Sequence, residues 1–204
     1  MAALDPWRPR PPLPEVLPGE DRSFGSGLFV DLVPQTCWFT NARSCISQRD
    51  WERVQRMVVG RAGARCEVCG AGRDAQAQRW LEVHECWAYN DADRVQSLRR
   101  LICLCTRCHQ ATHFGLAQVR GTAAAARAHL LTVTGMTQPQ AEQHITTAFQ
   151  VWPQRSQHAW ALDLTLLTAA GIDLTPPQTH TRAEASAAGP CRRSSCRELD
   201  ERRP

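Results

Sequence analysis

The chain has 204 residues, a net charge of +4, ten cysteines and a basic set that consists only of arginine. Its 43% hydrophobic and 22% charged residues exclude a fibrous or fully disordered chain. No apolar run approaches the roughly 18 residues of a membrane span, and no signal-peptide core follows the N-terminus. We therefore expect a cytoplasmic protein with reduced thiols and no membrane partner.

The two ends of the chain are predicted to be disordered. Six of the thirteen prolines fall within the first eighteen residues, and residues 1–25 bury too little apolar surface to offset the entropy of ordering. Residues 175–204 are polar and without periodicity, which predicts a mobile tail. We expect Cys191 and Cys196 in this tail to be free thiols, because no partner pair lies nearby.

Between the ends we distinguish an N-terminal segment that packs on the core, a cysteine- and histidine-rich domain and a helical extension, over residues 26–59, 60–121 and 122–174. In the first segment, Ser47 and Asp50 precede apolar residues at helical spacing, which predicts a capped helix. In the last segment, Thr137 and Gln140 predict a capping box at the start of another helix.

Two C-x2-C pairs in the middle domain predict a structural zinc site. The first is Cys66 with Cys69, and the second is Cys105 with Cys108. Each pair places two thiolates on adjacent corners of a tetrahedron, and two pairs complete a four-cysteine zinc site with Zn–S distances of about 2.3 Å. The other cysteines complete no pair at metal spacing and are expected to be small buried packing residues: Cys37, Cys45, Cys86 and Cys103.

A second set of metal ligands is predicted between and after these cysteines. Residues 80–87 and 98–105 predict two strands, and a helix is expected to begin near Thr106. On this helix two histidines four residues apart share one face, and a third comes from the first strand. Three imidazole ligands leave coordination positions open for water and substrate, which is typical of a catalytic ion. The three are His84, His109 and His113.

The motifs RCEVCG, LEVHECWAYND and LICLCTRCHQATHFGLA lie within residues 65–117. They resemble the ββα-metal nucleases of the HNH endonuclease superfamily, in the subgroup whose halves are clamped by a four-cysteine zinc. More narrowly, residues 28–172 look like a group of bacterial HNH-type proteins that share the HE dipeptide. The resemblance implies an α+β fold with a zinc-stapled ββα-metal, treble-clef-like core, a helical C-terminal extension and disordered tails.

The same resemblance implies hydrolysis of DNA phosphodiester bonds with the three histidines as ligands of a catalytic ion such as Mg²⁺, Mn²⁺ or Ni²⁺. Glu85 stands where most members have a histidine as general base. A carboxylate can act as the base if burial raises its pKa, and base, additional ligand and surface residue remain open roles for Glu85. Arg100 stands where the family has an asparagine that braces the loop.

An arginine-rich surface favours a nucleic-acid partner. Residues 40–120 carry thirteen arginines against eight acidic residues, an excess of five positive charges. The arginines predicted to contact phosphate are Arg99, Arg100 and Arg107. Two other hypotheses stay open: a nucleic-acid-binding zinc protein of this fold without hydrolysis, and a structural zinc module for protein interaction. Three further histidines are expected to be ordinary packing or surface residues: His129, His144 and His158.

Overall fold

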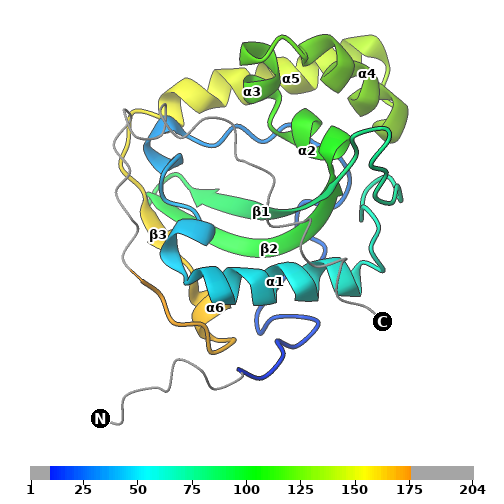
Figure 1. Ribbon diagram of the computed structural model, residues 1–204. Helices are drawn as coiled ribbons and strands as arrows, with labels where there is room; N and C mark the ends of the chain where they lie inside the picture. The colour runs from blue at the N-terminus through cyan, green and yellow to red at the C-terminus, as the bar shows by residue number, and fades with distance from the viewer. Residues whose placement is uncertain (1–9, 176–204) are drawn as a thin grey trace.

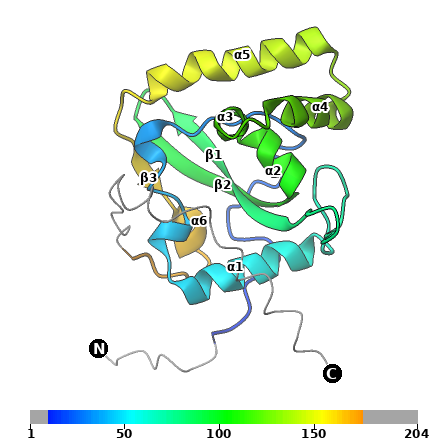
Figure 2. The ribbon, with the colours of Figure 1, turned by 45° about the horizontal axis from the view of Figure 1, so that its top comes forward.

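The computed structural model describes residues 10–175. It is a mixed α+β fold in which a three-stranded sheet lies between two helical layers (Figures 1 and 2). Helices α1 and α6 cover one face, and α2 to α5 cover the other. Residues 176–204 of the predicted C-terminal tail, with Cys191 and Cys196, lie outside the described residues.

The sheet is built on a long antiparallel hairpin. Strand β1 (Leu81–Asn90) pairs with β2 (Val95–Cys105), and the short β3 (Ala161–Asp163) runs parallel to β2. The strand order is β1-β2-β3, so β1 is an outer strand. Cys86 pairs with Arg100 but the next residue of β1 pairs with Leu98, which leaves one additional residue of β2 bulged at this point.

One layer is formed by α1 (Gln48–Arg61) and α6 (Thr165–Thr168). The predicted cap of α1 is confirmed, because the Ser47 side chain accepts a hydrogen bond from the backbone N–H of Asp50. The helix buries three apolar residues at helical spacing against the sheet: Trp51, Val54 and Val58.

The other layer contains four helices that follow β2 directly: α2 (Thr106–Thr112), α3 (Phe114–Val119), α4 (Ala123–Thr134) and α5 (Gln138–Arg155). The strand, turn, strand, helix order predicted for the middle of the chain is therefore observed. The predicted capping box of Thr137 and Gln140 is present at the start of α5. Phe114 and Leu130 are fully buried and form the centre of this layer.

Residues 10–25 differ from the disordered arm that the proline content predicts. Leu17 is 1% exposed and packs in the core with α1. The carboxylate of Glu20 accepts two hydrogen bonds from the Arg61 guanidinium, at 2.6 and 2.7 Å, and a third from the backbone N–H of Leu101. A buried, bidentate ion pair fixes a segment that hydrophobic content alone does not hold. Composition does not reveal this pairing, because its partners lie about 40 and 80 residues away.

The segment between this arm and α1 runs along the outer side of the sheet and contains two short 3-10 helices, η1 (Gln35–Cys37) and η2 (Arg43–Cys45). The prediction that four cysteines act as packing residues is confirmed, because all are buried: Cys37, Cys45, Cys86 and Cys103. Within residues 10–175, no helix is long and apolar enough to cross a membrane.

Candidate metal centres

Four cysteines from two distant turns meet in one cluster. Cys66 and Cys69 lie in a turn after α1 that Gly70 closes with a φ of +71°. Cys105 is the last residue of β2, and Cys108 lies in the first turn of α2. All four Sγ atoms lie within 4.8 Å of one another, and those of Cys69 and Cys105 are 3.6 Å apart. Tetrahedral zinc with Zn–S bonds of about 2.3 Å requires sulfur separations of roughly 3.8 Å, so the cluster fits zinc.

A fifth side chain contacts this cluster. The Nε2 atom of His129, on α4, lies 3.1 Å from the Cys108 Sγ. Burial lowers the pKa of His129, so the neutral ring can donate its Nε2–H to a Cys108 thiolate. A hydrogen bond of this kind stabilises a thiolate ligand and ties α4 to the metal centre. The sequence does not signal this contact, because it depends on how α4 packs against α2.

The three histidines that the sequence groups also come together in space. His84 lies in the middle of β1, His109 lies in α2 and His113 follows the last residue of that helix. Their ring centroids are 4.6 to 5.4 Å apart, and one ring nitrogen from each lies within 4.8 Å of the others. The spacing of four residues on α2 and the position opposite on β1 therefore direct three imidazoles at one point.

The chemistry of these histidines fits a divalent metal ion. His84 is 4% exposed, and its Nε2 atom is buried without a hydrogen-bond partner among the described residues. Burial and the adjacent imidazoles lower the pKa of His84 well below its usual value, and burial lowers the pKa of His113 to about 3. Neutral imidazoles present the lone pairs that metals bind. A buried nitrogen without a partner costs about 1–3 kcal/mol, which an ion at this point would offset.

Glu82 orients one of the three rings. It lies two residues before His84 on the same face of β1, and its Oε2 atom is 3.1 Å from Nδ1 of His109. Burial raises the pKa of Glu82, but the hydrogen bonds with His109 and Thr106 and the charges of His109 and His113 together lower it. A carboxylate that accepts the Nδ1–H of a histidine leaves Nε2 as the ligand atom and fixes the ring. Our sequence reasoning missed Glu82, although its alternation with His84 could have indicated it.

Glu85 lies on the opposite face of β1 from His84, beside the start of η2. Its neighbours on that face, Val83 and Trp87, pack in the core with α1. Burial raises the pKa of Glu85, against the backbone N–H groups of Arg43 and Ala42, which lower it. The Oε1 atom is buried and lacks a hydrogen-bond partner in residues 10–175. Glu85 is therefore a desolvated carboxylate and does not face the three imidazoles.

The arginines predicted to contact phosphate lie elsewhere. Arg100 is 6% exposed and donates to Glu67 at 2.8 Å, so it is a core residue and not a surface contact. The bulge at Arg99, immediately before it in β2, leaves its side chain directed inward, which the sequence does not show. Arg99 is exposed, and its guanidinium lies 3.7 Å from the carboxylate of Asp21. Arg107 is also exposed, and its charge contributes to the lowered pKa of His129 near the cysteine cluster.

One other exposed arginine lies near the histidines. The charge of Arg120, just after α3, lowers the pKa of His113. Arg120 is therefore better placed than Arg99 or Arg107 to meet an anion bound at the three imidazoles, although it was not singled out from the sequence. Arg43 is also exposed, and its charge acts on Glu85 on the other face of β1.

No known protein family, curated protein or solved structure matches this chain. The functional conclusion therefore depends on the geometry described above and on the motifs of the sequence.

Proposed function

We propose that the protein is a metal-dependent endonuclease of the HNH type that hydrolyses DNA phosphodiester bonds. The observation that carries the proposal is the meeting of three imidazoles from β1 and α2 around the buried Nε2 atom of His84. A divalent ion held there by His84, His109 and His113 would stabilise negative charge on the scissile phosphate and on the leaving oxygen. The β1, β2, α2 order and the neighbouring cysteine cluster agree with the family that the motifs resemble.

The residues around the trio have separate roles in this proposal. Glu82 holds His109 in the tautomer that leaves Nε2 toward the other two rings. Arg120, whose charge acts on His113, binds a flanking phosphate of the strand, and Arg43 lies beside Glu85. Burial keeps His84 and His113 neutral near pH 7, so no proton competes with ligand binding.

Glu85 is assigned the role of general base. In-line displacement requires the attacking water and the leaving oxygen on opposite sides of the phosphorus atom. Strand β1 is an outer strand, and the charge of His109 acts on Glu85 although the carboxylate lies on the other face of the strand. The raised pKa of Glu85 makes its carboxylate a better proton acceptor near neutral pH than an exposed glutamate. The water gives its proton to a carboxylate oxygen as it attacks.

The cysteine cluster positions these groups. Zinc bound to the four thiolates would join the turn after α1 to the junction of β2 and α2, immediately before His109. A bound ion at this junction fixes the direction in which α2 leaves the sheet. Its role is therefore structural, and the catalytic ion is a separate one.

Nicking of supercoiled plasmid tests the proposal. Wild-type protein is incubated with plasmid and Mg²⁺, Mn²⁺ or Ni²⁺, alongside His113→Ala, Glu85→Gln and the control His158→Ala. We expect nicking by wild type and by the control, and a loss of at least about 100-fold in the first two variants. Absence of nicking with every metal, or nicking that survives His113→Ala, contradicts the proposal.

Two other outcomes identify the competing hypotheses. Salt-sensitive DNA binding without cleavage indicates a binding protein of the same fold, and gain of cleavage in Glu85→His then identifies the missing base. One zinc per chain, no second divalent ion and no DNA affinity indicate a structural zinc module.

A further inference from the structure

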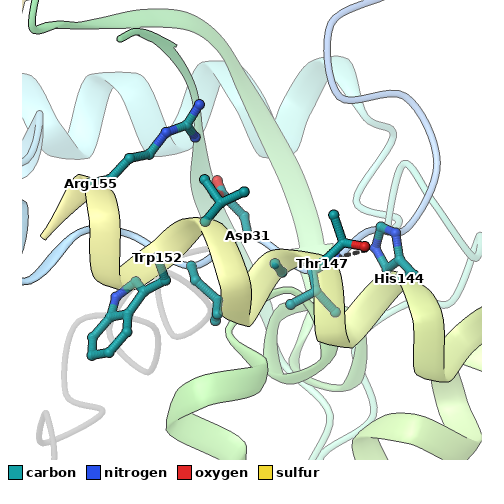
Figure 3. A pocket seen from close by; sticks show the side chains of 9 residues that line it. Asp31, His144, Thr147, Trp152 and Arg155 are labelled. Carbon is teal, nitrogen blue, oxygen red and sulfur yellow. Dashed lines mark hydrogen bonds between the residues drawn. The ribbon is translucent and has the colours of Figure 1, made fainter.

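A cavity of about 240 Å³ lies between α5 and the extended segment 28–33. Figure 3 shows the side chains that line it, with His144, Thr147, Trp152 and Arg155 from α5 and Asp31 from the extended segment. Pockets for drug-sized ligands occupy roughly 300–1,000 Å³. This cavity is smaller and suits a single planar group.

Asp31 is the polar group of the cavity that has no partner. Its carboxylate accepts no hydrogen bond from the residues that the structure describes, and Arg155 bonds to Asp91 instead, at 2.7 and 3.0 Å. Burial raises the pKa of Asp31 to about 6, against the charge of Arg155. A desolvated carboxylate without a donor is costly, so the cavity has an unused acceptor for an N–H group.

One residue that lines the cavity, Trp152, belongs to a fixed pair of aromatic rings. Trp152 stacks with Trp38, with ring centroids 6.4 Å apart and an angle of 24° between the planes. Both indole N–H groups donate to the carbonyl oxygen of Val33, at 2.9 and 3.0 Å. Trp38 is 50% exposed, and its neighbour Phe39 is 37% exposed. Fixed, exposed aromatic rings of this kind stack with nucleobases.

The segment that carries Asp31 contacts the residue before His113. The backbone N–H of Asp31 donates to the carbonyl oxygen of Thr112 at 2.9 Å, and the next residue is His113. The charge of Asp31 also contributes to the raised pKa of Cys86, which lies two residues after His84 on the same face of β1. A strand with one phosphate at the histidines can therefore place a neighbouring nucleotide in the cavity.

We propose that this cavity binds one unpaired nucleobase that carries an exocyclic amino group, next to the scissile phosphate. The amino group donates to the carboxylate of Asp31, and the ring lies against Trp152 and the apolar side chains Leu32 and Val151. Uracil and thymine present the oxygen O4 in place of the amino group of cytosine, so a base held with this position at Asp31 places an acceptor against the carboxylate. The position next to the scissile phosphate rests on the proposed nuclease function, whereas base binding itself does not.

Binding of two matched oligonucleotides tests this proposal. Labelled single-stranded dC12 and dU12 differ at C4, which carries an amino group in cytosine and a carbonyl oxygen in uracil, and at the adjacent N3, which carries a proton only in uracil. Their affinity is measured by fluorescence anisotropy with the full-length His113→Ala variant, which removes cleavage. We expect dC12 to bind about tenfold more tightly than dU12. Asp31→Ala removes the preference, Trp152→Leu weakens both oligonucleotides by about tenfold, and the control Glu142→Gln, on the same helix outside the cavity, changes neither.

Each result separates the cavity from the nuclease. Equal affinity for dC12 and dU12, or a preference that survives Asp31→Ala in a variant that is folded at the assay temperature, overturns the cavity proposal even if the wild type nicks plasmid. If the preference depends on Asp31 but the protein never nicks plasmid, the proposal for the cavity stands and the proposal of a nuclease fails.

Discussion

Replacing Asp31 by asparagine is expected to stabilise the folded protein at neutral pH. Burial raises the pKa of this carboxyl from 3.8 to about 6. The ionised form is therefore disfavoured in the folded state, and stability is lost as the pH rises from about 4 to about 6. The interval between these pKa values corresponds to a decrease in the free energy of unfolding of about 3 kcal/mol at pH 7.5 and of about half of that at pH 5. Both figures are upper limits, because Asp31 retains partial exposure to the cavity.

The assay is urea unfolding of wild type and Asp31→Asn between pH 5 and pH 7.5, with zinc present throughout. The difference in the free energy of unfolding should favour the variant and should increase with pH, because only the wild type carries the buried charge. Asp93→Asn, at an exposed position in the β1–β2 turn, serves as the control. A variant that is less stable than wild type at pH 7.5, or a difference that does not change with pH, refutes the assignment of Asp31 as a desolvated carboxylate without a partner.

Three more predictions concern the metal centres and the core. Cys108→Ser should reduce bound zinc, measured by elemental analysis, and lower the melting temperature by more than 10 °C, because it removes a ligand that fixes α2; full zinc content would contradict this. Glu82→Ala should weaken Mn²⁺ binding by about 10- to 100-fold in calorimetry and keep zinc bound; unchanged Mn²⁺ affinity would show that Glu82 does not orient His109. Arg100→Met should destabilise the fold by about 3 kcal/mol, because it removes the buried guanidinium that pairs with the buried carboxylate of Glu67. The DNA affinity of the folded variant should not change. A tenfold loss of affinity would instead place Arg100 at the phosphates.

Local patterns predicted the parts of the structure that depend on neighbouring residues. The cap of α1 at Ser47 and the capping box of α5 at Thr137 each involve residues three positions apart. The C-x2-C pairs and the spacing of His109 and His113 are also local, so the sequence could indicate which side chains would meet. The pairing of β1 with β2 then required only a short turn.

Contacts between distant elements could not be predicted in this way. The inward direction of Arg100 depends on its pairing with Glu67, 33 residues earlier. The approach of His129 to Cys108 depends on the packing of α4 on α2, and the order of residues 10–25 depends on a buried ion pair between Glu20 and Arg61. Charge and proline content describe composition, and composition does not determine which partner a charged side chain finds.

Anomalous diffraction from crystals grown with Mn²⁺ locates the divalent ion. We expect one anomalous peak within about 2.3 Å of a ring nitrogen of His84, His109 and His113, separate from the zinc peak at the four cysteines. This peak, and not the zinc peak, should disappear in His113→Ala. An empty histidine cluster at saturating Mn²⁺, or a peak that Glu85 binds in place of the histidines, would contradict the account.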